Sequence, residues 1–66
     1  MSVARVTEIN ASGDTIENAI RNGVERASQT LQNVEGVWVS DIKAPVENGQ
    51  IREFRVNMKV TFILAE

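Results

Sequence analysis

Residues 54–64, FRVNMKVTFIL, alternate apolar and polar side chains almost without a break. Successive side chains of a β-strand point to opposite faces of its sheet, so this pattern predicts a strand with one apolar and one polar face. The apolar row comprises Phe54, Val56, Met58, Val60, Phe62 and Leu64, and the polar row comprises Arg55, Asn57, Lys59 and Thr61. We expect the strand to run over residues 50–64 and its apolar row to form the core.

The element that should cover this apolar row is a helix over residues 15–33. Its apolar residues recur at steps of three and four, which places them on one stripe of a helix. Asp14 stands three residues before Glu17, a spacing typical of a capping box. Gly36 is expected to end the helix as a left-handed C-terminal residue. The stripe comprises Ile16, Ala19, Ile20, Gly23, Val24, Ala27, Leu31 and Val34.

Two further strands complete the expected fold. Residues 3–9 predict a first strand, followed by a loop over residues 10–15 (NASGDT), and residues 37–46 predict a second strand with Pro45 near its end. Asn48-Gly49 favours a type I′ hairpin turn before the last strand. The chain is therefore expected to be one α+β domain over residues 1–66, of order β-α-β-β. Its three-stranded antiparallel sheet packs on one amphipathic helix.

A single helix covers only one face of a sheet, so the other face needs an explanation. If Val37 and Val39 face the helix, then Trp38, Ser40 and Ile42 face away from it, beside the polar row of the last strand. One interpretation is a subunit interface, in which Trp and Arg are enriched. The other is a platform on which a flat aromatic ligand stacks on the indole while Arg55 and Asn57 bind its edge. Both hold if the ligand lies between subunits.

Composition narrows the function classes. A chain of 66 residues buries only about 60% of its unfolded surface, and small domains usually need disulfides, metals or oligomerisation. Cys and His are both absent, which excludes disulfides and disfavours zinc and nucleophilic catalysis. The net charge of -2 disfavours nucleic acid, and no apolar run is long enough to span a membrane. We expect a non-enzymatic, oligomeric, cytoplasmic protein.

Charged side chains have two candidate roles. The acidic residues offer oxygen ligands of the kind that calcium and magnesium prefer, but no chelating loop is present, so the metal ligands stay unassigned. Arg55 and Lys59 are expected to pair with Glu53 and Asp41 across strands. The acidic residues in question are Asp14, Glu17, Glu25, Asp41 and Glu53.

The whole chain resembles the dodecins. The resemblance lies in its length, the order of its elements and two stretches, AIRNGVERASQTLQNV (19–34) and FRVNMKVTFIL (54–64). It implies a hollow homododecamer of cubic symmetry, with helices outside and sheets facing inward. Flavin-binding dodecins sandwich paired isoalloxazine rings between Trp side chains of symmetry-related subunits, and they store or quench flavin without turnover.

Two positions depart from the flavin-binding pattern. Flavin dodecins have their stacking Trp at the start of the second strand, where this chain has Gly36, and Trp38 stands two residues later, about 6.6 Å along a strand. They also have a Gln that binds the polar edge of the ring, where this chain has Arg55, which offers donors only. The RVNMKVTF stretch resembles a subgroup with such departures, and one branch of that subgroup is described as binding calcium.

The predicted function is a dodecin-like homododecameric shell that binds or stores a small ligand. The ligand is expected to be a cation, such as calcium, or another small molecule. The first alternative is a flavin-storage dodecin that binds riboflavin or FMN through Trp38. The second is a structural assembly without a ligand. The candidate binding residues are Gly36, Trp38, Arg55 and Asn57.

Overall fold

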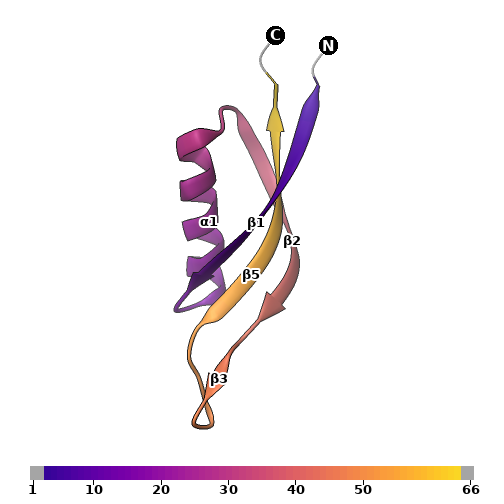
Figure 1. The fold of residues 1–66 in the computed structure, drawn as a ribbon. Coiled ribbons are helices and arrows are strands. Elements are labelled where there is room, and N and C mark those ends of the chain that lie inside the picture. The colour runs from indigo at the N-terminus through magenta and orange to yellow at the C-terminus, as the bar shows by residue number, and fades with distance from the viewer. Residues whose placement is uncertain (1–2, 65–66) are drawn as a thin grey trace.

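A computed structural model describes residues 3–64 of the chain. The predicted order of strand, helix, strand and strand is confirmed, except that a hairpin with two short strands precedes the last long strand (Figure 1). The elements are β1 (Ala4–Gly13), α1 (Ile16–Thr30), β2 (Val34–Lys43), β3 (Val46–Glu47), β4 (Gln50–Ile51) and β5 (Phe54–Ile63). The predicted strand over residues 50–64 is therefore interrupted at Arg52 and Glu53.

The three long strands form an antiparallel sheet in the order β1-β5-β2. Strand β5 is central, and helix α1 lies along one face of the sheet (Figure 1). The centre of β5 is paired on both sides, with Met58 opposite Ile9 of β1 and Val39 of β2. The predicted α+β class, one helix on a three-stranded antiparallel sheet, is confirmed.

The core lies between α1 and the apolar row of β5. Val56, Met58 and Val60 are fully buried, as expected from the alternation. On the helix, Ala19 and Gly23 are also buried. Gly23 is needed for this close approach, because a Cβ there would collide with the end of the Met58 side chain.

The junction between β1 and α1 differs from the prediction. Strand β1 continues to Gly13, which is paired with Phe54, because the ladder with β5 overrides the turn-prone composition of residues 10–13. The helix is capped by Thr15, whose Oγ1 accepts a hydrogen bond from the backbone N–H of Asn18 at 3.0 Å. The prediction of a capping box on Asp14 is therefore wrong. Gly13 packs tightly here, since a Cβ would lie 2.7 Å from the Ala19 nitrogen.

The helix also ends earlier than predicted. It stops at Thr30, and the left-handed residue that follows is Asn33, with φ of 60°, rather than Gly36. Asn33 is held in place by the backbone N–H of Ile63, which donates to its carbonyl at 3.1 Å. The contact with β5 thus fixes the turn, and Gly36 becomes part of β2.

Strand β2 is irregular, and this moves one predicted side chain. Its register against β5 shifts between Val39 and Asp41, so that Ser40 is an extra residue in the ladder. Ile42 is consequently opposite the buried Val56 and lies on the helix side of the sheet, where it is 50% exposed. The expectation that Ile42 faces away from the helix is wrong because a bulge reverses the alternation.

Strands β3 and β4 form a short arm that extends beyond the sheet (Figure 1). Asn48 and Gly49 both have positive φ, at 54° and 74°, which agrees with the predicted hairpin turn. Pro45 lies after β2 rather than within it, and its carbonyl accepts from the Arg52 N–H at 2.8 Å.

Candidate ligand-binding site

The sheet face that α1 leaves uncovered, hereafter the open face, carries side chains from three strands. Residues directly opposite each other in a ladder point to the same side, so the register of β5 with its two neighbours defines the rows of this face. The rows are Glu8, Lys59 and Trp38; Asn10, Asn57 and Asp41; and Ser12, Arg55 and Lys43.

Trp38 is the largest apolar group on the open face. Its side chain is 70% exposed. It is paired across the ladder with Lys59, and the Lys59 Nζ lies 5.6 Å from the centroid of the indole, a distance typical of a cation–π contact. The indole is therefore available for stacking, with an ammonium group already against it.

Asn57 connects all three strands through hydrogen bonds. Its Nδ2 donates to Oε2 of Glu8 on β1 at 2.8 Å and to Oγ of Ser40 on β2 at 3.3 Å. The Ser40 hydroxyl in turn donates to the Asn57 carbonyl at 3.0 Å. The amide of Asn57 is thus held in one orientation by neighbours on either side. Sequence reasoning missed Glu8 as a partner, since the register of β1 is not visible in its composition.

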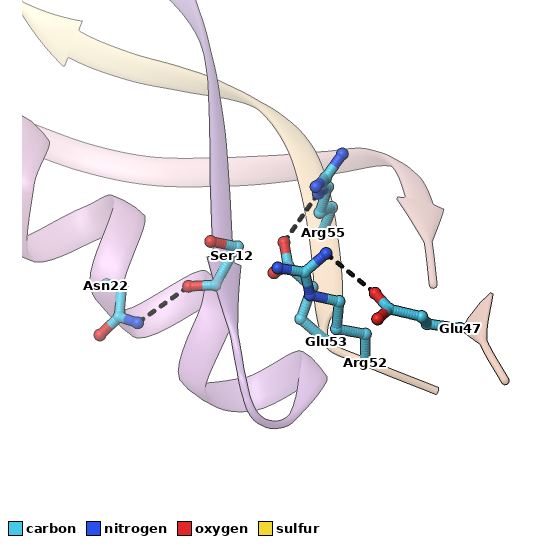
Figure 2. A network of polar contacts seen from close by, with 6 residues as sticks. All are labelled: Ser12, Asn22, Glu47, Arg52, Glu53 and Arg55. Carbon is cyan, nitrogen blue, oxygen red and sulfur yellow. Dashed lines mark hydrogen bonds and ion pairs between the residues drawn. The ribbon is translucent and has the colours of Figure 1, made fainter. Parts of the chain in front are cut away.

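Arg55 is already engaged within its own chain. Its Nε donates to Oε2 of Glu53 at 2.7 Å (Figure 2). Nearby, Nη1 of Arg52 donates to Oε2 of Glu47 at 3.1 Å. The hydrogen bond from Arg55 lowers the pKa of Glu53, with the nearby charges of Arg55 and Arg52 adding to the effect. The predicted pairing of Arg55 with Glu53 is confirmed, though the two are neighbours along the chain rather than across strands.

Lys59 does not make the predicted ion pair. The register places Asp41 opposite Asn57, one row away, while Lys59 is opposite Glu8 and Trp38. Among residues 3–64, no carboxylate lies within the 4.0 Å of the Lys59 ammonium that an ion pair requires.

A shallow hollow of about 330 Å³ lies on the open face. It has the size of a small-molecule pocket, at the lower end of the usual range. Its lining offers both charges as well as amide donors and acceptors, which suits a polar ligand better than an apolar one. The lining residues are Glu8, Asn10, Asp41, Lys43, Arg55 and Asn57.

The four predicted site residues share the open face but do not form one cluster. Arg55 and Asn57 both line the hollow, whereas Trp38 lies beside Lys59. Gly36 is one row further along, opposite Thr61. A Cβ at Gly36 would have no atom within 4 Å, so the space above it is open.

The described residues do not contain a preformed metal centre. Within residues 3–64, no three acidic side chains come close enough together to hold one ion. In the same part of the chain, no helix is both long and apolar enough to cross a membrane.

Comparison with known proteins agrees with this architecture. The family model described as Dodecin matches residues 3–65, nearly the whole chain. The chain belongs to the dodecin family. Dodecins are dodecameric, non-enzymatic proteins that bind small ligands, flavins among them. Among curated proteins, none matches the sequence.

Solved dodecin structures are similar over essentially the full length. A dodecin from Streptomyces davaonensis is 41% identical, with a TM-score of 0.94 over 98% of this chain and 97% of that one. A dodecin from Streptomyces coelicolor is 36% identical, with a TM-score of 0.93 over 98% and 94%. A mutant of the Thermus thermophilus dodecin is 25% identical, with a TM-score of 0.94 over 100% of this chain and 98% of that one.

Proposed function

We propose that this dodecin forms a hollow homododecamer of cubic symmetry that binds and stores a small ligand in the cytoplasm without chemical turnover. In this assembly the helices lie outside, and the open face of each sheet faces inward or a neighbouring copy. The ligand is a cation or another small molecule, bound differently from the flavin of flavin-binding dodecins.

The observation that carries the proposal is the uncovered open face. It exposes Trp38 together with a polar hollow. A small domain with one sheet face uncovered is only marginally stable as a monomer. Strands β1 and β2 are both edges of the described sheet, with backbone groups available to a partner. Self-assembly covers such surfaces, and an enclosed inner face is a natural place for a stored ligand.

The two altered positions argue against the usual flavin mode. At Gly36, the place of the stacking Trp in flavin dodecins, there is open space instead of a ring. At Arg55, the place of their Gln, a guanidinium is hydrogen-bonded to Glu53 and presents no acceptor to a ring edge. Under this proposed correspondence, Gly36 offers no ring for stacking and Arg55 offers no acceptor, which supports a ligand other than flavin.

A cation would need ligands from more than one copy. One chain brings Glu8 and Asp41 to the open face but, within residues 3–64, no group of three acids. In a symmetric shell, one carboxylate from each subunit meets its copies around an axis, which supplies the oxygen ligands that calcium requires.

Flavin binding through Trp38 is the second candidate. Its support is the 70% exposure of the indole on the same face as Gly36. A structural assembly without a ligand is the third, and it requires that the hollow and the indole are filled by neighbouring copies alone.

Native mass spectrometry of the protein purified without added ligand tests the proposal. We expect a mass of twelve subunits, either bare or carrying cation-sized increments that a chelator removes. Mass increments of flavin size and a yellow colour would instead support the flavin alternative. A colourless dodecamer unaffected by chelator and by added small molecules would favour the structural alternative, and a monomer or dimer would overturn the assembly itself.

A further inference from the structure

We propose that the open face selects a planar ligand that carries a negative charge, with Trp38 as the stacking surface and Lys59 as the residue that sets the preference for charge. This inference rests on the proposed small-ligand function and names the chemical class of that ligand. It assigns Asn57 the role of a positioning residue that keeps Glu8 away from Lys59.

The first step is the contact between Lys59 and Trp38. With its ammonium 5.6 Å from the indole centroid, Lys59 competes with any ring that approaches that side of Trp38. A cationic ring would be repelled by the ammonium. A neutral ring would displace the ammonium from the indole and offer it no charged partner in place of the lost cation–π contact. A ring bearing a carboxylate or phosphate keeps the ammonium beside it as a counter-charge, so the anion is preferred.

The second step explains why the ammonium is available. Glu8 stands directly opposite Lys59 in the β1–β5 ladder, where opposite charges ordinarily pair. Its carboxylate accepts instead from Nδ2 of Asn57 at 2.8 Å, and Ser40 holds the same amide from the other side. Because Asn57 binds Glu8, no carboxylate of residues 3–64 lies within ion-pair distance of Lys59.

The third step concerns the other charges of the open face. Asp41 is opposite Asn57, one row away from the pair of Lys59 and Trp38. Arg55 and Glu53 neutralise each other through their 2.7 Å contact. The position of positive charge nearest to the indole is therefore Lys59. Of the two acids that line the hollow, Asp41 lies one row toward Arg55, and Glu8, in the row of Lys59, is bound by Asn57.

Binding of two flat probes that differ in charge tests this inference. We would titrate the assembled protein with 2-naphthoate and with the neutral 2-naphthylmethanol by isothermal titration calorimetry at low ionic strength. The anion is expected to bind about fivefold more tightly, the ratio that an exposed charge pair supports. Raising the salt concentration should reduce this ratio.

Three variants localise the effect. Lys59→Gln should remove the preference for the anion while retaining the neutral probe, and Glu8→Gln should increase the preference by removing the only acid opposite Lys59 on β1. Trp38→Ala should weaken both probes. Arg21→Gln is the matched control, because it also removes one positive charge but from the exposed surface of α1, where Arg21 contacts Glu17.

Equal affinity for the two probes, or an unchanged ratio in Lys59→Gln, would overturn the inference. An intact dodecamer that binds neither probe would also overturn it, while leaving open storage of a cation. Native mass spectrometry of each sample separates these results from failure of the proposed function, in which the protein is not a dodecamer at all.

Discussion

The two faces of strand β5 have opposite surroundings although their residues alternate along one chain. Val56, Met58 and Val60 are fully buried under α1. Arg55, which precedes Val56, and Lys59, which lies between Met58 and Val60, are exposed on the open face. The same ten-residue strand therefore serves as the centre of the core and as the middle of the candidate site.

This difference separates stability from binding. On the covered face, side chains contribute by removing apolar area from water, and their partners lie in the same chain. On the open face, polar groups such as Asn57 make hydrogen bonds to β1 and β2, and any further partner must come from outside the chain. Substitutions on the two faces should therefore differ in kind as well as in size.

The largest effect should come from the covered face. Met58→Ala removes a fully buried side chain between α1 and the sheet, and we expect a loss of about 2–5 kcal/mol in the free energy of unfolding. Guanidinium-induced unfolding at fixed protein concentration measures it, since assembly adds to apparent stability. Lys59→Ala is the control on the open face and should cost less than about 0.5 kcal/mol. Equal costs would show that the open face is packed as tightly as the core.

A pair of substitutions on the open face should create flavin binding. Gly36→Trp fills the open space at the start of β2, and Arg55→Gln supplies both a donor and an acceptor. Stacking on an aromatic side chain contributes about 1–3 kcal/mol, so the affinity for riboflavin should rise roughly tenfold or more. Quenching of riboflavin fluorescence measures it. If the double variant binds no better than the natural chain, the correspondence of Gly36 and Arg55 to the flavin-dodecin positions is wrong.

Two glycines provide a matched pair for the two environments. Gly13→Ala places a Cβ 2.7 Å from the Ala19 nitrogen, and the resulting strain should cost about 1–3 kcal/mol. Gly36→Ala meets no atom within 4 Å and should change stability by less than about 0.5 kcal/mol. Thermal unfolding of both variants and of the natural chain measures these two losses in stability. A large loss in Gly36→Ala would indicate that a neighbouring copy approaches the backbone there.

The smallest effect should be the pH dependence of the contact between Glu53 and Arg55. The hydrogen bond lowers the pKa of Glu53, so its stabilising contribution is present above the unfolded-state pKa, near 4.5, and is lost as the pH falls through the folded-state value. Unfolding midpoints of the natural chain and Glu53→Gln, measured between pH 7 and pH 3, should therefore converge at the acidic end. A constant difference over this range would mean that the carboxylate charge contributes nothing.

The fold and the content of the open face were largely predictable because they depend on local patterns. Alternation in residues 54–64 predicted both faces of β5, and helical spacing predicted the stripe of α1. The errors occurred where two segments compete for the same residues. Pairing with Phe54 holds Gly13 in β1, and the hydrogen bond from Ile63 fixes the turn at Asn33. In both cases the partner lies about 30 or more residues away along the chain, so the local sequence does not reveal it.

The candidate site shows the same division. That Trp38, Arg55 and Asn57 lie on one face follows from sequence spacing alone, as does the absence of His and Cys chemistry. The bulge at Ser40, which turns Ile42 to the helix side and Asp41 to the open face, is a property of the ladder with β5. The Asn57 contact that draws Glu8 away from Lys59 is likewise a property of the tertiary structure.

The sequence by itself determined which side chains each strand can present, because alternation is local. Only the tertiary structure decided which of them meet, because the register joins residues that lie far apart along the chain.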